Sequence, residues 1–206
     1  MRPMSTPYES SGRSAQKSRT RSALVEAARA LVAAGVTPTV EEAAAAASIS
    51  RTTAYRYFPN KRALLLAAHP EVGAPSMLPA DPPSDPVARL NLVVGAFTEM
   101  ILETEAQQRT MLRLSLEDTT ERGELPLRQG RAIRWIGEAL EVLRGRLSDA
   151  ELELLVNAIR ATVGIEALVW LVDIGGLSRQ DAAALMRWSA LALLEVALTS
   201  PPPVAR

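Results

Sequence analysis

The chain has 206 residues, 48% hydrophobic and 22% charged, which is enough apolar material for one large or two small globular domains. It has no cysteine, which excludes a disulfide framework, a thiolate zinc site and a thiol nucleophile. The formal net charge is zero, yet the residues through Leu65 include ten basic and four acidic side chains, so this part carries +6 and the remainder −6. This uneven distribution of charge indicates an N-terminal part that faces phosphates; chance is the alternative explanation.

The sequence offers little for catalysis or for metal binding. Its single histidine, His69, precedes Pro70 at the expected end of a helix, where a surface or capping role is typical. There is no Gly-rich phosphate loop, no H-E-x-x-H and no G-x-S-x-G. We therefore expect no enzyme activity, no metal and no cofactor.

The N-terminus is polar and basic and lacks the apolar segment of a secretory signal. Charged residues interrupt the apolar runs before they reach the roughly 18 residues that a membrane span needs. We therefore expect a soluble, cytoplasmic protein without a membrane partner.

The first 17 residues are rich in Ser, Arg, Pro and Gly and have no apolar period, which predicts a disordered basic arm over 1–17. Basic side chains in and just after it either track DNA phosphates and enter a minor groove or belong to a solvated tail: Arg13, Lys17, Arg19 and Arg21. A first helix is predicted over 19–34, where apolar residues recur at three- and four-residue spacing and Gly35 ends the pattern.

The next stretch, from Thr39 to Leu66, predicts two short helices, a tight turn between them and the start of a third helix. Thr39 with Glu42 has the spacing of a capping box at a helix start. A run of alanines follows and ends at Ser48, and Ser50 is placed to cap the helix that begins at Arg51. Two short helices joined by such a turn form the helix-turn-helix arrangement of DNA-binding proteins.

The segment S-R-T-T-A-Y-R-Y-F-P-N-K-R-A-L-L, residues 50–65, resembles the N-terminal domain of the tetracycline-repressor (TetR/AcrR) family of transcriptional regulators. The resemblance is specific over about residues 20–68. Two positions depart from the family pattern: Ser48 stands in the turn where glycine is usual, and Ala43 stands where a larger aliphatic residue is usual.

The resemblance implies a role for each residue of the helix-turn-helix that faces DNA. The residues expected to contact the DNA backbone are Thr39, Thr53, Tyr55 and Lys61, and those expected to face base edges are Arg51, Thr52, Arg56 and Tyr57. The chemistry agrees, because arginine reads guanine through two hydrogen bonds and Lys61 opens a helix whose free amides also favour an anion. Phosphate contacts set the register and base contacts set the sequence.

The predicted organisation is all-α, with a DNA-binding domain over 18–69, a Pro-rich linker over 70–86 and a helical body over 87–206. Apolar periodicity and capping signals predict the body's helices at about 86–107, 109–116, 127–147, 148–174 and 178–198, with a loop at 119–126.

The last two helices are apolar nearly all round, which indicates burial on more than one side. In a body of this size, that predicts a homodimer in which these helices pair across subunits, as they do in the family. Burial within a single subunit is the alternative. Two DNA-reading helices one DNA turn apart would bind a pseudo-palindromic operator.

By resemblance, a small-molecule effector binds among the helices of the body. Candidate ligand-contacting residues are Phe97, Met100, Met111, Trp135, Thr162, Glu166 and Trp170. For each one singly, an ordinary place in the core or in an ion pair is the alternative. Glu166 needs a partner in so apolar a helix, and Arg131, Arg134 or a cationic ligand are the candidates.

These observations favour a DNA-binding transcriptional regulator, a homodimeric repressor that a small apolar or amphipathic effector releases from its operator. A DNA-binding dimer without an effector is the first alternative. An all-α ligand-binding protein or enzyme that merely kept a helix-turn-helix is the second.

Overall fold

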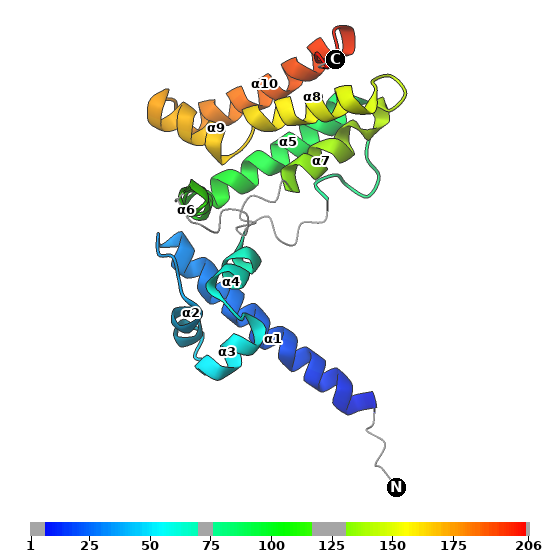
Figure 1. Ribbon diagram of the computed structural model, residues 1–206. Helices are drawn as coiled ribbons and strands as arrows, with labels where there is room; N and C mark the ends of the chain where they lie inside the picture. The colour runs from blue at the N-terminus through cyan, green and yellow to red at the C-terminus, as the bar shows by residue number, and fades with distance from the viewer. Residues whose placement is uncertain (1–6, 70–75, 117–130, 205–206) are drawn as a thin grey trace.

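The computed structural model describes residues 7–69, 76–116 and 131–204, and within these ranges it is helical and has no strand. The chain forms an N-terminal head of four helices and a larger helical body, which lie at opposite ends of an elongated molecule (Figure 1). The predicted fold class, all-α with an N-terminal helix-turn-helix domain, is confirmed.

The head consists of α1 (Pro7–Ala33), α2 (Val40–Ala46), α3 (Arg51–Tyr57) and α4 (Lys61–Ala68). Its core is built largely from small side chains, so the helices pack closely: Leu24, Val25, Ala28, Val40, Ala43, Ala44, Ala54, Phe58, Leu64, Ala67 and Ala68. Ala43, where the family has a larger residue, is fully buried, as is Ala54 of α3.

The first helix is longer than the sequence pattern predicted. It begins at Pro7 rather than near residue 19, so the part of the expected disordered arm that the structure describes is helical. Side chains on successive turns support it, since Arg19 and Thr20 both hydrogen-bond to Gln16, at 2.7 and 3.0 Å. Because the packed C-terminal half of α1 has already nucleated the helix, adding further turns costs little free energy. The N-terminal half can therefore be helical although its sequence has no apolar period.

The body contains six α-helices in the described part of the chain, together with a 3₁₀ turn and a π-helical turn. Their bounds are α5 (Pro86–Glu103), α6 (Glu105–Leu116), α7 (Arg131–Leu140), η2 (Glu141–Leu143), α8 (Asp149–Thr162), α9 (Ile165–Val169), η3 (Trp170–Ile174) and α10 (Arg179–Thr199). Helices α5, α7, α8 and α10 pack side by side around one apolar core. At its centre the rings of Phe97 and Trp135 meet edge to face, with centroids 5.7 Å apart.

Capping signals in the sequence located the starts of three body helices correctly. Asp85, Ser148 and Ser178 each accept a hydrogen bond from the backbone amide three residues on. Three predicted helix ends were wrong. The helix expected to reach residue 147 stops at Leu140 and passes into the 3₁₀ turn η2. The helix expected to reach residue 107 stops at Thr104, whose hydroxyl bonds back to the Met100 carbonyl at 2.6 Å.

The helix expected to run from 148 to 174 breaks at Gly164, which has φ of +154°. Residues with a β-carbon rarely adopt this backbone conformation, so the break favours glycine; a β-carbon there would also displace the ends of the Arg160 and Glu166 side chains. The predicted loop at 119–126 and the predicted helical residues 127–130 lie outside the described residues.

The described part of the Pro-rich stretch, residues 76–85, is attached to the body. Ser76 donates a hydrogen bond to Glu138 at 2.8 Å, and Arg89 donates to the carbonyls of Glu138 and Ala139 at the end of α7, at 2.7 and 2.8 Å. Met77 and Leu78 pack against the body core.

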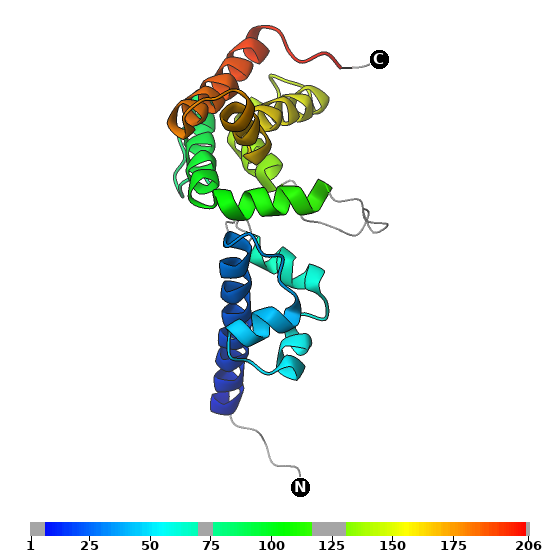
Figure 2. The ribbon, with the colours of Figure 1, turned by 90° about the vertical axis from the view of Figure 1, so that its left-hand side faces the viewer.

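Helix α6 lies across the end of α1 and joins the head to the body (Figure 2). Val32, Leu65 and Met111 form a small buried cluster between them. Polar contacts surround it: Gln107 donates to the Arg29 carbonyl at 3.2 Å, Thr110 to the Val32 carbonyl at 3.3 Å, and Arg113 to the Thr37 hydroxyl at 3.1 Å.

His69 also lies at this junction, as the C-cap of α4, and it is buried rather than on the surface. Burial first, and then the nearby charges of Arg131 and Arg29, lower the pKa of His69 to about 4. The imidazole is therefore neutral at neutral pH.

Helix α6 is also tied to the last part of the body by ion pairs. Arg109 binds both carboxylate oxygens of Asp173, at 2.6 and 2.9 Å, and also Glu105 at 2.7 Å. Arg179 at the start of α10 binds Glu105 as well, at 3.0 Å. These contacts lower the pKa of the Glu105 carboxyl, and the bond from Arg179 is the largest cause.

Two helical stretches, Asp149–Ile174 and Arg179–Thr199, are long and apolar enough to cross a membrane by length and composition. The sequence analysis expected charged residues to interrupt every apolar run before it was long enough to span a membrane. That expectation was wrong for these two stretches, which pass the test although they contain charged residues such as Glu166 and Arg187. In the structure both stretches pack as helices of the body, against each other and against α5 and α7.

Candidate nucleic-acid interface

The turn between α2 and α3 has the geometry that the sequence predicted. The Thr39 hydroxyl accepts from the Glu42 amide at 3.2 Å while Glu42 accepts from the Thr39 amide at 2.7 Å, so the capping box is complete. Ser50 caps α3 by accepting from the Thr53 amide at 3.3 Å. Among the described residues, Ser48 is the one non-glycine with a positive φ, +55°, so it adopts the left-handed conformation that the family's glycine provides.

Helix α3 presents one exposed face, and the predicted base-reading residues divide between this face and the core. Arg51, Thr52 and Arg56 are exposed. Tyr57 is half-buried and packs against the head core, and Thr53 is half-buried, with its hydroxyl accepting from Ser50 at 2.8 Å. The exposed residues of α3 are therefore an arginine at each end with Thr52 and Tyr55 between them.

Tyr55 and Arg51 converge on one carboxylate of α2, that of Glu41. The Tyr55 hydroxyl donates to Glu41 Oε1 at 2.7 Å, and Arg51 Nη2 lies 2.9 Å from the same oxygen. The Arg51 guanidinium also lies over the Tyr55 ring, 5.7 Å from its centroid. The Tyr55 hydrogen bond is the main cause that lowers the pKa of Glu41, and it raises the pKa of Tyr55 in turn.

Glu41 is a residue that sequence reasoning missed. An acidic residue in the first turn of a helix is ordinarily explained by the helix dipole. Only the crossing of α2 and α3 brings its carboxylate to the two side chains that were assigned to DNA.

The remaining predicted backbone contacts flank α3. Lys61 is exposed at the first turn of α4, where Asn60 accepts from the Ala63 amide at 2.8 Å. Thr39 is exposed at the start of α2, but its hydroxyl donates to Glu42 at 2.9 Å, so a bond to phosphate requires it to turn away. On α1, Lys17, Arg19 and Arg21 are exposed, and Arg21 lies over the Phe58 ring at the end of α3, 5.4 Å from its centroid.

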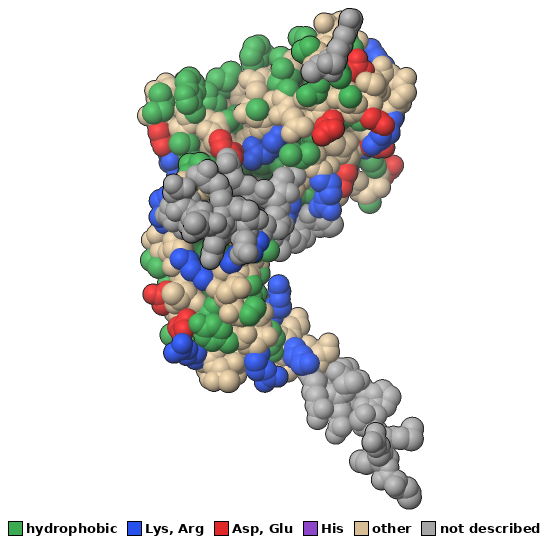
Figure 3. Space-filling model, in the orientation of Figure 1, with side chains coloured by type: hydrophobic (Ala, Val, Ile, Leu, Met, Phe, Trp, Pro, Cys, Tyr) green, Lys and Arg blue, Asp and Glu red, His purple; other side chains and the backbone are tan. Residues whose placement is uncertain are grey.

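The surface view shows Lys and Arg side chains gathered around the end of the head that lies away from the body (Figure 3). This is the end that carries α3 and the N-terminal half of α1 (Figure 1). A basic surface with an exposed helix is suited to the phosphates and groove of duplex DNA.

The candidate ligand residues of the body do not form one cavity. Phe97 and Trp135 are fully buried against each other, Met100 is half-buried, and Met111 belongs to the junction with the head. Thr162, Glu166 and Trp170 do lie together, along a hollow of about 390 Å³ between α8–α9 and α10. Glu166 pairs with Arg160 at 3.2 Å, a partner that the sequence analysis did not suggest.

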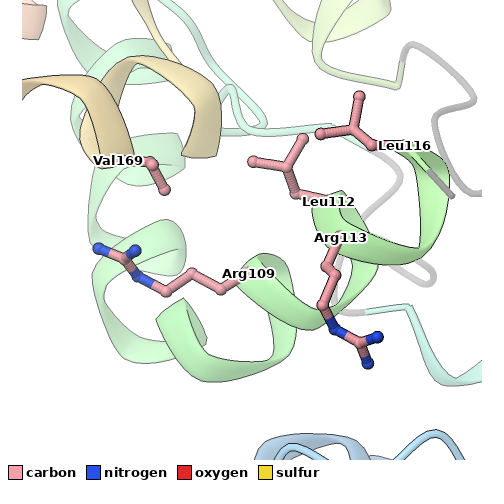
Figure 4. Close-up of a pocket in the computed structure, with 5 residues that line it drawn as sticks. All are labelled: Arg109, Leu112, Arg113, Leu116 and Val169. Carbon is pink, nitrogen blue, oxygen red and sulfur yellow. The ribbon is translucent and has the colours of Figure 1, made fainter. Parts of the chain in front are cut away.

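A second hollow, of about 450 Å³, opens between α6 and α9. Figure 4 shows Leu112, Leu116 and Val169 pointing toward the shared space, whereas Arg113 points away toward the head. Arg109 lies at its side, already paired with Asp173 and Glu105. The exposed lining is largely apolar, and the charge of Arg109 is met by these two carboxylates.

Large apolar side chains are exposed along one face of the last two elements. Trp170, Trp188, Ile174 and Val196 have relative exposures of 61%, 66%, 74% and 59%. In the surface view, green side chains line the edge of the body farthest from the head (Figure 3). Exposed apolar patches of this kind mark interaction surfaces.

Comparison with known proteins agrees with this architecture. The model of the family described as "Bacterial regulatory proteins, tetR family" matches residues 24–68, which are the helix-turn-helix region of the head. No curated protein matches the chain in sequence.

Two solved structures share the fold. A TetR transcriptional regulator from Rhodococcus sp. RHA1 is 20% identical, with a TM-score of 0.56 over 88% of this chain and 97% of that one. A Clostridium perfringens protein, named for an inferred role as a fatty acid metabolism regulator, is 17% identical, with a TM-score of 0.56 over 82% of this chain and 97% of its own. The chain thus carries a tetR-family helix-turn-helix domain, the DNA-binding part of a transcriptional regulator, on an all-helical body whose fold these structures share.

Proposed function

We propose that the protein is a homodimeric repressor that binds a pseudo-palindromic operator through α3 and is released from it by a small apolar or amphipathic effector. The observation that carries the DNA-binding part is the exposed, arginine-bearing face of α3 on the basic end of the head. Arg56 and Thr52 face base edges in this proposal, and Lys61 and Thr39 contact the backbone on either side.

The dimer is supported by the exposed apolar face of the last two elements. Trp170 and Trp188 are each more than half exposed in a single chain, although tryptophan ordinarily buries most of its surface. Covering this face with a second copy removes the patch and keeps the two apolar helical stretches in a soluble, cytoplasmic protein. It also presents two copies of α3 to one duplex, which a two-fold symmetric site requires.

The effector part rests on the two apolar hollows of the body. The hollow between α6 and α9 lies next to the junction between head and body. The hollow at Trp170 lies on the proposed dimer face. An effector acts by preferring one arrangement of head and body, and it shifts the population by its difference in affinity for the two.

A DNA-binding dimer without an effector remains a second candidate. The observation that favours it is the filled interior, because the aromatic residues expected to line a pocket, Phe97 and Trp135, pack against each other instead.

One experiment tests these proposals together. Duplexes selected from random sequence by the full-length chain should converge on a pseudo-palindrome, and sedimentation should show a dimer that occupies it. Binding should weaken steeply with salt. Repeating the selection with a small-molecule panel separates the two candidates, since a compound that lowers operator affinity requires an effector site. A monomer with no preferred sequence would overturn both.

A further inference from the structure

We propose that Glu41 is a specificity-determining residue of the DNA-reading surface, which positions Arg51 for a base and repels phosphates from that end of α3. This inference rests on the proposed DNA-binding function and deepens it. The observations that carry it are the shared carboxylate oxygen, 2.7 Å from the Tyr55 hydroxyl and 2.9 Å from Arg51 Nη2.

The contact constrains what Tyr55 can do. A phenol has one O–H to donate, and here it is donated to Glu41. In this arrangement Tyr55 has no proton left for a phosphate oxygen, which is the role that family resemblance implies for it. The hydroxyl instead holds the Glu41 carboxylate in place, so Tyr55 acts through Glu41 and is a positioning residue.

The same contact leaves Arg51 able to read a base. Guanidinium carries five N–H donors in a planar fork, and Glu41 engages one nitrogen, Nη2. The Tyr55 ring beneath the guanidinium restricts its plane. A long side chain that is 73% exposed is otherwise free to bind any nearby phosphate, so these two contacts favour one orientation over many.

The charge of Glu41 adds discrimination. A carboxylate on a surface that approaches the duplex is repelled by phosphates, and specificity is often built from such unfavourable contacts with the wrong partner. On the operator, a base edge that accepts hydrogen bonds from Arg51 offsets this repulsion. On random DNA that base is usually missing, so the repulsion from the phosphates is not offset.

The test compares wild type with Glu41→Gln on the selected operator and on random duplex of equal length. Affinity of the variant for random DNA should rise about two- to fivefold, the range for releasing an exposed ion pair, while operator affinity stays level or falls. The salt dependence on random DNA should steepen by up to about 0.9 in log–log slope, one additional phosphate contact. Equal changes on both duplexes would overturn the proposal.

Matched controls separate charge from position. Glu26→Gln removes the same charge from α1, where Glu26 pairs with Arg29, and should leave the operator-to-random ratio unchanged. Glu41→Asp keeps the charge but is too short for both contacts, so operator affinity should fall without a gain on random DNA. A Glu41→Asp variant that retains the wild-type ratio would contradict the positioning role. Melting curves confirm that each variant is folded.

Two further variants test the route through Tyr55 and Arg51. Tyr55→Phe should lower the operator-to-random ratio; equal loss on both duplexes with a shallower salt slope would show instead that the hydroxyl binds phosphate. In an Arg51→Ala background, Glu41→Gln should no longer lower the ratio. If the wild-type protein binds all sequences equally, both the proposed function and this inference are wrong. If the wild-type protein prefers the operator and Glu41→Gln keeps the same preference, only the inference is wrong.

Discussion

The head and the body of this protein have hydrophobic cores of different composition. The head has a core of alanines and a few larger residues, so its short helices lie close together and its polar side chains are held by caps and by each other. The body has a core of large aliphatic and aromatic residues and leaves an apolar face exposed. The head's core is closed except at its junction with α6, whereas the body exposes large apolar side chains that the proposed dimer would cover.

The largest expected effect is on the body's exposed face. Trp188→Glu places a charge where two proposed dimer halves meet, so dimerisation should weaken at least about 30-fold, the loss of about 2 kcal/mol typical of an interface hot spot. Sedimentation equilibrium measures this. Val142→Glu, at an exposed apolar residue of η2, is the control that should leave the dimer intact. If the tryptophan variant remains as dimeric as the control, this face is not the interface.

On the head, Arg56→Ala should cost about 1–3 kcal/mol of operator affinity and relax the preference at one base position, because arginine reads guanine by two hydrogen bonds. Lys61→Ala should instead weaken binding to all sequences and reduce the salt slope by about 0.9, the contribution of one phosphate. Binding to an operator library with single substitutions measures both. Uniform loss across the library for Arg56→Ala would reassign it to the backbone.

The junction between the two regions should respond to pH through His69. Its pKa is lowered from 6.5 to about 4 in the fold, so the unfolded chain binds more protons between these values and stability falls as pH falls. From about pH 7 to about pH 5 the free energy of unfolding should drop by roughly 2 kcal/mol. Denaturant titrations measure it. His69→Gln should remove most of this dependence; an unchanged slope would assign it to other groups.

The smallest expected effect is in the turn of the head. Ser48→Gly should stabilise the fold by about 0.5–1 kcal/mol, because a side chain in the left-handed region is strained and glycine is not. A rise in the melting temperature with unchanged operator affinity is the expected result. A loss of stability would mean that the Ser48 side chain contributes more than its backbone conformation costs.

Local signals in the sequence predicted the starts of helices well in both the head and the body. Thr39, Ser50, Asp85, Ser148 and Ser178 all cap helices as expected, since a cap depends on residues only three positions apart. The helical form of residues 7–17 was missed because it has no apolar period and depends on the packed turns that follow.

The tertiary contacts were beyond sequence reasoning. Glu41 meets Tyr55 and Arg51 only because α2 crosses α3, and Glu166 meets Arg160 only because the helix breaks at Gly164. Likewise, periodicity shows that Phe97 and Trp135 face inward but not whether they enclose a space or fill it.

Helix α6 is held from two directions, by Met111 and Arg113 on the head and by Arg109 and Glu105 on the last elements of the body. Its twelve residues include no proline or glycine, the usual causes of a kink, so we expect it to move as one rigid element. In the proposed dimer, a tilt that separates α6 from Asp173 would also move the end of α1, so the angle between the two heads would depend on the shape of the body.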